Sequence, residues 1–384
     1  MSPTPVTTSE LTPTGPSVYT WEATDEEVAA RYGLRIERVA RFDLNTSPAP
    51  PALAARVLAA GRFERPLSEY PPSDYRRLSE AAAAVYGVAR EEILVGAGAD
   101  EILDLCAKAF LRAGAAAVLP SPSYAMFRVL TEQRGATVVD VPRGGARAGY
   151  AMDVPAVRSA ARDANLVWLC TPNNPTGLAE PAGAVEQLLD GLASDAASAG
   201  RVPPVAVLDE AYAEFAGGTL LGLRERYPRL VVVRTASKAY ALAGLRVGFA
   251  LALPSLIAEI EPYRPPGSVS VVSVTVVTEA LKTPEEMQVN VARIAAERER
   301  LAGALGAVGW SVGPSITNFL LVDFETPARA AGVAHHLLRS GLVPRTFGPG
   351  HPLAGQLRLT VRSPKENDRL IEAAADLAGD EDGV

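Results

Sequence analysis

The chain is poor in the residues that mark disulfide-stabilised and metal-binding proteins. Among its 384 residues are two cysteines, Cys106 and Cys170, and three histidines. The cysteines lie far apart in apolar surroundings, so we expect two buried free thiols in a reducing compartment rather than a disulfide. His335, His336 and His351 lack the spacing of zinc ligands, and we therefore expect no structural metal site.

Long apolar runs and an excess of basic residues are also missing. No apolar run reaches the length of a membrane-spanning helix, and the formal net charge of -7 offers no basic footprint for nucleic acid. Residues 1–16 are rich in Thr, Pro and Ser and lack the charged start and apolar centre of a secretion signal, so we expect a loose arm. These features favour a cytoplasmic globular protein that binds neither membranes nor nucleic acid.

The most informative stretch is a lysine segment that follows an apolar run. Residues 230–233 predict a buried strand, and Lys238 comes just after it, among small and hydroxyl residues that include Thr235 and Ser237. A poorly solvated lysine is available as a nucleophile for a Schiff base. After a turn of the chain, Arg246 can lie close to Lys238 and provide a fixed positive charge there. A lysine beside hydroxyls and an arginine suits an aldehyde that carries a phosphate, and pyridoxal phosphate is such a molecule.

A second segment predicts a cradle for a phosphate group. Residues 93–102 run from a strand through a glycine turn into a helix. The backbone N–H groups around Gly98 and Ala99, at the positive end of the helix, are the candidate donors, with Asp100 as the helix cap. The segment has neither the Gly-Lys-Ser/Thr of a P-loop nor the glycine spacing of a dinucleotide fingerprint, so it favours one small phosphate.

Two further strand ends carry polar residues. The apolar residues 166–170 lead into Thr-Pro-Asn-Asn-Pro-Thr-Gly, in which two prolines restrict the backbone and aim Asn174. Residues 205–208 form an apolar run that ends at Asp209, and Tyr212 follows three residues later. A buried aspartate without a partner is unfavourable, so we expect a cationic partner for Asp209.

Together, Ser-Lys-Ala-Tyr-Ala-Leu-Ala-Gly-Leu-Arg at 237–246, Asn-Pro-Thr-Gly at 174–177 and the strand ending at Asp209 resemble fold-type I pyridoxal-phosphate aminotransferases. The sequence is most similar to the histidinol-phosphate aminotransferases, over roughly residues 40 to 375. The order of strands and helices by itself predicts an α/β sandwich. The resemblance implies three layers around a mostly parallel central sheet, with a smaller α+β domain. We expect an N-terminal arm over 1–45, a large cofactor-binding domain over 46–282 and a small domain over 283–384 that packs with the arm.

The resemblance also implies a role for each cofactor-site residue. Lys238 would hold the cofactor as an aldimine and transfer protons, Asp209 would pair with the pyridine nitrogen, and Asn174 and Tyr212 would bond the phenolic oxygen. Tyr124 would lie flat on the ring, although a core tyrosine is the alternative. The remaining cofactor contacts would come from Gly98, Ala99, Asp100, Thr235, Ser237 and Arg246.

One more cofactor contact is expected from a neighbouring subunit. Tyr70, in a Tyr-Pro segment, matches a family tyrosine that reaches the cofactor phosphate of the other subunit. A tyrosine packed in an ordinary turn is the alternative interpretation. The family role implies a homodimer with shared active sites.

Three residues are candidates for substrate binding. Asn45 matches a family segment near the substrate, with a polar loop as the alternative. Arg358 matches an arginine that binds a substrate anion, and Arg345, 13 residues earlier, matches one that joins it when the substrate carries phosphate. A guanidinium suits a carboxylate or phosphate, but Arg345 is also compatible with a plain surface arginine. The sequence departs from the family at 46–47 and 267–268, both near the expected site.

We therefore expect an enzyme that moves an amino group between an L-amino compound, with L-histidinol phosphate as the leading candidate, and 2-oxoglutarate. A related enzyme on another substrate remains open, either a transaminase of aromatic or specialised amino acids or a decarboxylase of phosphorylated amino acids. A non-catalytic regulatory domain would need the loss of Lys238 or Asp209, or an added DNA-binding module, and the sequence shows neither.

Overall fold

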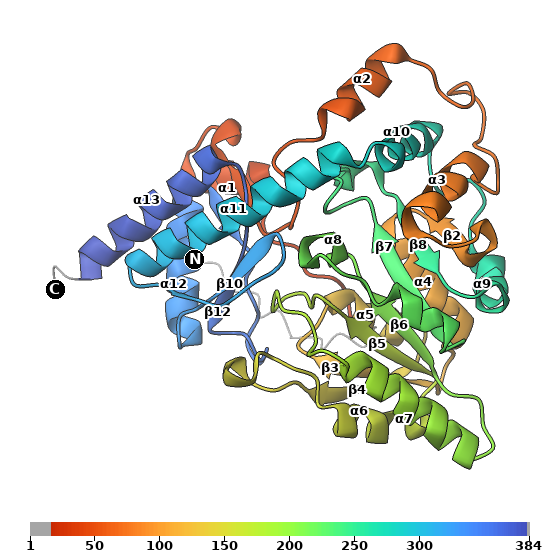
Figure 1. Cartoon of the computed structure of the whole chain (residues 1–384). Helices are drawn as coiled ribbons and strands as arrows, with labels where there is room; N and C mark the ends of the chain where they lie inside the picture. Colours follow the sequence, from red (N-terminus) through yellow and green to blue (C-terminus); the bar gives the residue numbers. More distant parts are fainter. Residues whose placement is uncertain (1–16, 382–384) are drawn as a thin grey trace, which may run out of the picture.

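The computed structural model describes residues 17–381, so the expectation of a loose arm at 1–16 lies outside the described residues. A seven-stranded sheet forms the centre of the larger lobe (Figure 1), in the order β2-β8-β7-β6-β5-β3-β4. Its strands are β2 (Ile93–Gly96), β3 (Ala116–Ser121), β4 (Thr137–Pro142), β5 (Leu166–Cys170), β6 (Val205–Asp209), β7 (Leu230–Thr235) and β8 (Gly248–Leu251). Only β8 runs antiparallel to its neighbours among these strands, so the sheet is mostly parallel, as predicted.

Alternate residues of the strands face two different apolar layers. Leu166, Trp168 and Cys170 pack into one cluster with helices α4, α5 and α9, whereas Val167 and Leu169 pack into another with α2, α3, α6, α7 and α10. The bounds are α2 (Ala52–Ala60), α3 (Arg76–Tyr86), α4 (Gly98–Phe110), α5 (Ala125–Gln133), α6 (Val154–Ala160), α7 (Ala184–Ser198), α9 (Pro254–Ile260) and α10 (Val271–Lys282). This period of two, buried on both faces, is what a central parallel sheet requires. The predicted three-layer sandwich is confirmed.

The smaller lobe has a core of its own, built on a three-stranded antiparallel sheet in the order β12-β10-β9. Its elements are α1 (Asp25–Tyr32), β1 (Ala40–Phe42), α11 (Glu285–Ala307), β9 (Ser311–Val312), β10 (Phe319–Asp323), α12 (Pro327–Arg339), β11 (Leu342–Pro344), β12 (Gln356–Thr360) and α13 (Pro364–Glu381). The N-terminal strand β1 pairs with β11, and α11 runs from the larger lobe into the smaller one (Figure 1). From these clusters we propose domain boundaries near residues 45 and 282.

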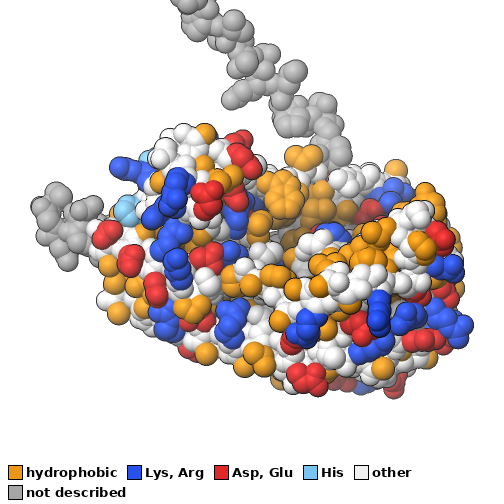
Figure 2. All heavy atoms as spheres, turned by 90° about the horizontal axis from the view of Figure 1, so that it is seen from above, with side chains coloured by type: hydrophobic (Ala, Val, Ile, Leu, Met, Phe, Trp, Pro, Cys, Tyr) orange, Lys and Arg blue, Asp and Glu red, His pale blue; other side chains and the backbone are white. Residues whose placement is uncertain are grey.

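The surface and the thiols bear on the remaining compositional expectations. Cys106 and Cys170 are both free and buried, as predicted. Basic and acidic side chains are interspersed over the face shown in Figure 2. Within residues 17–381, no helix is long and apolar enough to cross a membrane, and no group of three or more potential metal ligands comes together.

Candidate active site

Residues at or just after the carboxyl ends of β2, β3, β5, β6 and β7 line one cavity of about 480 Å³. This is the edge at which parallel sheets place their ligands. Of the fifteen residues predicted for the site, thirteen line this cavity: Asn45, Ala99, Asp100, Tyr124, Asn174, Asp209, Tyr212, Thr235, Ser237, Lys238, Arg246, Arg345 and Arg358. Gly98 lies directly beside Ala99 at the start of α4. Tyr70 lies elsewhere.

Lys238 follows the end of β7, where the chain turns towards the cavity. Its Nζ donates a hydrogen bond to the Asn45 carbonyl (3.2 Å) and lies 5.7 Å from the centre of the Tyr212 ring. Burial, assisted by the positive charge of Arg358, lowers the pKa of Lys238 from 10.5 to about 8. A large share of the lysine is therefore the neutral, nucleophilic amine near pH 8.

Asp209 ends β6 and is 4% exposed. Among the described residues, its carboxylate accepts one hydrogen bond, from the Ala211 N–H (3.0 Å), and it enters no ion pair. Burial raises the pKa of Asp209 to about 7, mainly through loss of solvation. A buried carboxylate with so few partners calls for a cation in the cavity. The sequence analysis expected a cationic partner for Asp209, and no side chain within residues 17–381 forms an ion pair with it.

The predicted phosphate cradle lies at the start of α4. Gly98 has φ +86°, and a Cβ added there would lie 2.5 Å from Arg246 Nη2, so only glycine fits this turn. The first-turn N–H groups of an α-helix have no acceptor within the helix. Ser237 and Thr235 approach from β7, with their hydroxyl oxygens 2.9 Å apart. The arrangement gathers N–H groups, a hydroxyl pair and a guanidinium around one small volume.

The prediction that Asp100 caps this helix is wrong. The helix begins at Gly98, where the backbone has a positive φ, so its N-cap is Ala97, three residues earlier than expected, and no described side chain caps it. The Asp100 carboxylate instead accepts a hydrogen bond from Tyr124 Oη (2.8 Å) and pairs with Arg246 Nη2 (3.1 Å). Asp100 therefore orients two other residues of the site.

Arg358, in β12, is buried and points into the cavity from the smaller lobe. Its Nη1 donates to Asn174 Oδ1 (2.6 Å), and its Nη2 donates to the carbonyl of Asp43. Its Nε has no hydrogen-bond partner among residues 17–381, and burial lowers the pKa of the guanidinium. An under-coordinated buried cation is suited to an incoming anion.

Asn45 is held more tightly than a polar loop would require. It has φ +53°, its N–H donates to Thr360 Oγ1 (2.9 Å), and its Nδ2 donates to Tyr212 Oη (3.0 Å). Asn318, which the sequence analysis missed, donates from Nδ2 to the Asn45 carbonyl (2.9 Å). Asn318 lies immediately before β10 and 273 residues from Asn45, and no local sequence motif predicts its contact.

The arm before α1 supplies two aromatic residues that were also missed. Tyr19 and Trp21 line the cavity and meet edge to face, with ring centres 4.8 Å apart. The guanidinium of Arg345 lies 5.2 Å from the centre of the Tyr19 ring. The sequence feature that could have identified these two residues is a Tyr-x-Trp pattern near the end of a Pro-rich arm.

The position of Tyr70 and the two departures from the family pattern complete the site. Tyr70 is 86% exposed on the chain surface, so its expected role at a neighbouring subunit stays a prediction. Gly267 lies beside the Tyr70 ring, and Ser268 donates from Oγ to Glu101 Oε2 (2.9 Å). Ser47 Oγ accepts a hydrogen bond from Asn290 Nδ2 (3.2 Å). The departures at Ser47 and Ser268 therefore form hydrogen bonds with neighbouring elements.

The chemistry of this cavity fits pyridoxal 5'-phosphate. The cradle at Gly98 would take the phosphate, the buried carboxylate of Asp209 matches a protonated ring nitrogen, and the Lys238 amine matches an aldehyde. Each of these three groups lacks a strong partner of opposite character within residues 17–381. The donor set and the cofactor are therefore complementary in charge and in hydrogen bonding.

Comparison with known proteins identifies the family. The family described as aminotransferase class I and II matches residues 43–373. A histidinol-phosphate aminotransferase from Roseiflexus castenholzii is 38% identical over 364 residues, covering 92% of this chain and 93% of that protein. One from Symbiobacterium thermophilum is 35% identical over 353 residues, covering 91% of this chain and 92% of that protein.

Solved structures agree with the sequence relatives. The histidinol-phosphate aminotransferase from Sinorhizobium meliloti, solved in complex with pyridoxal-5'-phosphate, has a TM-score of 0.83 at 26% identity and covers 94% of this chain and 96% of that one. The aspartate aminotransferase from Thermus thermophilus with maleate shares the fold, at a TM-score of 0.75, and covers 93% of this chain and 97% of that one. This chain therefore belongs to the class I and II aminotransferases, pyridoxal 5'-phosphate-dependent enzymes that move amino groups between amino compounds and 2-oxo acids.

Proposed function

We propose that this aminotransferase uses L-histidinol phosphate as its amino donor and 2-oxoglutarate as its acceptor. The observation that carries the proposal is the buried, under-coordinated Arg358 guanidinium in the same cavity as the Lys238 amine and the unpaired Asp209 carboxylate. This arrangement offers one reacting amine and a fixed cation for an anionic substrate. The relatives from Roseiflexus castenholzii and Symbiobacterium thermophilum, which carry the name histidinol-phosphate aminotransferase, support the choice of donor.

The residues that would hold the cofactor follow from the donors of the cavity. The α4 N–H groups at Gly98, Ala99 and Asp100 would bind its phosphate, together with Thr235, Ser237 and Arg246. Asp209 would bind the ring nitrogen, Asn174 and Tyr212 the ring oxygen, and Tyr124 one ring face. Within the described chain, Asn174 Nδ2 has no hydrogen-bond partner, and the Tyr212 hydroxyl accepts from Asn45 and keeps its own proton for donation. Bound pyridoxal phosphate supplies an electron sink that stabilises negative charge at the substrate Cα.

Lys238 would act as the base and acid of the reaction. A pKa near 8 leaves its amine partly neutral at working pH, so it can accept the proton from the substrate Cα and return a proton to the neighbouring carbon of the cofactor. The hydrogen bond to the Asn45 carbonyl keeps Nζ at the floor of the cavity (3.2 Å). Asp209, held ionised by a cationic ring, would keep the ring nitrogen protonated.

The two arginines would recognise the substrate anions in turn. Arg358 would take the carboxylate of the oxo acid in one half-reaction and the phosphate of the amino donor in the other. Arg345 would join it when a phosphate is bound. Both guanidiniums present several N–H donors, which suits either anion.

We further propose that the enzyme is a cytoplasmic homodimer. The two free buried thiols support a reducing compartment. Four large apolar side chains that remain exposed lie between positions 58 and 85: Leu58, Leu67, Tyr70 and Val85. A second copy that covers this segment would bury them and would bring Tyr70 towards a cofactor phosphate.

The visible absorbance of the bound cofactor tests the donor. L-Histidinol phosphate is added to the loaded enzyme without any oxo acid, and we expect loss of the resting absorbance band with one oxo product per site. L-Histidinol, which lacks the phosphate, should require far higher concentrations. The Lys238→Ala variant should give no oxo product, whereas Lys282→Ala, which changes an exposed lysine, should react normally.

Other outcomes point to the related enzymes. If the absorbance band does not change with L-histidinol phosphate but changes with an aromatic amino acid, the amino donor is the aromatic amino acid. The proposed cofactor chemistry would still hold. Release of carbon dioxide from an O-phospho-amino acid would identify a decarboxylase. Normal turnover by Lys238→Ala would contradict the role of this lysine.

A further inference from the structure

The segment before α1, residues 17–24, contributes lining residues to the cavity and is held by hydrogen bonds near both of its ends. At one end, the Ser17 N–H donates to Glu132 Oε2 of α5 (2.9 Å), in the larger lobe. At the other end, Arg41 Nη1 donates to the Ala23 carbonyl (2.6 Å). Tyr19 and Trp21 lie between these ties and line the cavity. The arm therefore contributes one wall of the site.

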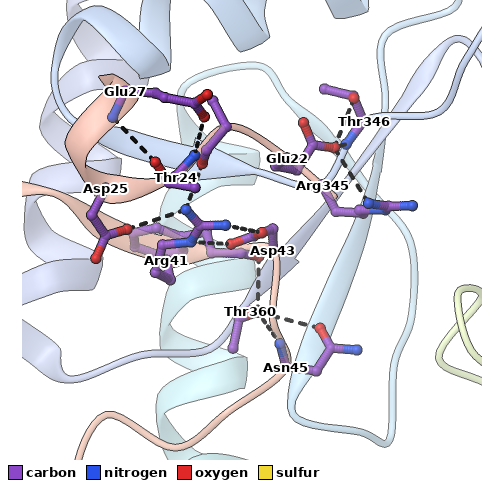
Figure 3. A network of polar contacts seen from close by, with 12 residues as sticks. Glu22, Thr24, Asp25, Glu27, Arg41, Asp43, Asn45, Arg345, Thr346 and Thr360 are labelled. Carbon is purple, nitrogen blue, oxygen red and sulfur yellow. Dashed lines mark hydrogen bonds and ion pairs between the residues drawn. The ribbon is translucent and has the colours of Figure 1, made fainter. Parts of the chain in front are cut away.

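A third tie joins the arm directly to Arg345. Glu22 Oε1 accepts hydrogen bonds from the N–H (2.7 Å) and the hydroxyl (2.8 Å) of Thr346, the next residue after Arg345. The same oxygen lies 3.8 Å from Arg345 Nη1, and the side chains of Arg345 and Glu22 are 15% and 18% exposed. Figure 3 shows Glu22 between Thr346 and Arg345. Glu22 is thus a carboxylate placed beside a guanidinium of the cavity.

Among the described residues, the guanidinium contacts of Arg345 all come from this arm. Nη1 donates to the Thr20 carbonyl (2.6 Å), the group stacks over Tyr19, and Glu22 supplies the only ion pair recorded for it within residues 17–381. Meanwhile, the positive charge of Arg345 contributes to the lowered pKa of Arg358. The two arginines proposed to bind the substrate anion therefore both line the cavity, and the arm partly neutralises one of them.

We propose that Glu22 is a positioning residue that holds the arm on Thr346 and competes with the substrate anion for Arg345. The proposal rests on the proposed function, in which Arg345 binds the phosphate of the donor. An arriving phosphate must share or displace the Glu22 carboxylate, so Glu22 sets how tightly the anionic end of substrate and product is bound. The hydrogen bonds to Thr346 need only an acceptor oxygen, whereas the competition needs the negative charge.

These two tasks are separated by Glu22→Gln. Glutamine keeps an acceptor oxygen for Thr346 and removes the charge beside Arg345. A partly exposed ion pair of this kind is modest in strength, so we expect the KM for L-histidinol phosphate to fall about threefold with kcat unchanged. The KM for L-histidinol should stay the same. The matched control is Glu26→Gln, which removes one negative charge from an exposed position in α1 that forms no side-chain hydrogen bond or ion pair within residues 17–381.

A second readout does not depend on turnover. Trp21 is 69% exposed at the cavity, whereas Trp168 and Trp310 are buried. Its fluorescence in the cofactor-loaded enzyme is followed as orthophosphate is added at constant ionic strength. The half-saturating concentration should be about threefold lower in Glu22→Gln than in the wild type and unchanged in Glu26→Gln. A Trp21→Phe variant, in which the signal should vanish, verifies its origin.

The outcomes separate the two proposals. The role of Glu22 is overturned if Glu22→Gln binds orthophosphate as tightly as the wild type or more weakly. It is also overturned if Trp21 fluorescence does not respond to orthophosphate in the wild type or in any variant. If the wild type fails to convert L-histidinol phosphate while the orthophosphate titrations behave as expected, the donor is wrong and the role of Glu22 stands.

Discussion

At the scale of single residues, the site depends on two buried groups whose pKa values are shifted in favour of their neutral forms. Burial lowers the pKa of Lys238 to about 8 and raises that of Asp209 to about 7. Each pKa shift means that the charged form of the group is unfavourable in the cofactor-free protein. A cationic ring and a substrate would remove this free-energy cost. The site is therefore arranged for its ligand rather than for the stability of the empty protein.

Asp209→Asn should make this cost visible. The folded-state pKa of Asp209 is raised, so in the cofactor-free enzyme its carboxylate destabilises the fold increasingly as the pH rises from about 4 to about 7. Asparagine keeps an acceptor for the Ala211 N–H and should increase the free energy of unfolding at pH 8 by roughly 1–3 kcal/mol. In the cofactor-loaded enzyme we expect the opposite sign, because the ring nitrogen then loses its counter-charge.

Urea denaturation of the empty and loaded forms, at pH 5 and pH 8, measures both effects. Asp376→Asn, at an exposed position, controls for the change in net charge. A gain of equal size at both pH values, or a loaded variant more stable than the loaded wild type, would contradict the ring-nitrogen assignment.

Residue types and short spacings predicted much of the site, because strand ends and turns are local. Lys238, Asp209 and Asn174 each follow an apolar strand within a few residues, and all three line the cavity. Asn318 and Glu22 were not predictable in this way. Their contacts join segments 273 and 324 residues apart, and they depend on how the lobes and the arm pack rather than on any local pattern.

At the scale of elements, the start of α4 shows what a motif does and does not determine. The Gly-x-Gly pattern predicted the turn, but the sequence analysis assigned the cap to Asp100. The first helical residue is Gly98 itself, and Asp100 is turned towards Tyr124 and Arg246. Helix ends are set by backbone dihedral angles, which a pattern of residue types predicts only to within about two to four residues.

Gly98→Ala should impair cofactor binding beyond its effect on stability. The position has φ +86°, and the new Cβ would lie 2.5 Å from Arg246 Nη2, so the arginine must move away from the cradle. We expect the affinity for pyridoxal 5'-phosphate to fall by about tenfold or more, which corresponds to roughly 1–2 kcal/mol. Equilibrium titration of the empty protein with the cofactor measures it.

Gly114→Ala is the matched control for backbone strain. Gly114 has a similar φ of +80°, but a Cβ there would meet nothing within 4 Å. This variant should lose about 1 kcal/mol of stability and bind the cofactor normally. Equal loss of cofactor affinity in both variants would show that strain, and not the displacement of Arg246, is responsible.

At the scale of the whole molecule, the alternating burial of the strands defines the sandwich, whereas the arm depends on long-range pairing. The apolar runs at 166–170 and 205–208 predicted central strands because they are buried on both faces. By contrast, β1 pairs with β11 at Ala40 and Leu342, and this pairing joins residues 40–42 to the smaller lobe. A strand of three residues is too short for its hydrophobic pattern to predict which strand it pairs with.

The proposed homodimer is the prediction that belongs to this scale. The segment from 58 to 85 exposes Leu67 at 67% and Tyr70 at 86%, which a second copy would cover. We expect the wild type to sediment as a species of about twice 40.3 kDa. Leu67→Asp would place a charge in that apolar contact, so its dimer should dissociate at concentrations at least about tenfold higher than those that dissociate the wild-type dimer.

Val202→Asp provides the control, because Val202 is comparably exposed at 74% and lies in the loop before β6. It should remain a dimer with normal turnover. Analytical ultracentrifugation over a dilution series, paired with activity at each concentration, links assembly to the shared site. A wild-type monomer with full turnover, or a Leu67→Asp dimer as tight as the wild type, would place the interface elsewhere and remove the reason for giving Tyr70 a role at the neighbouring cofactor.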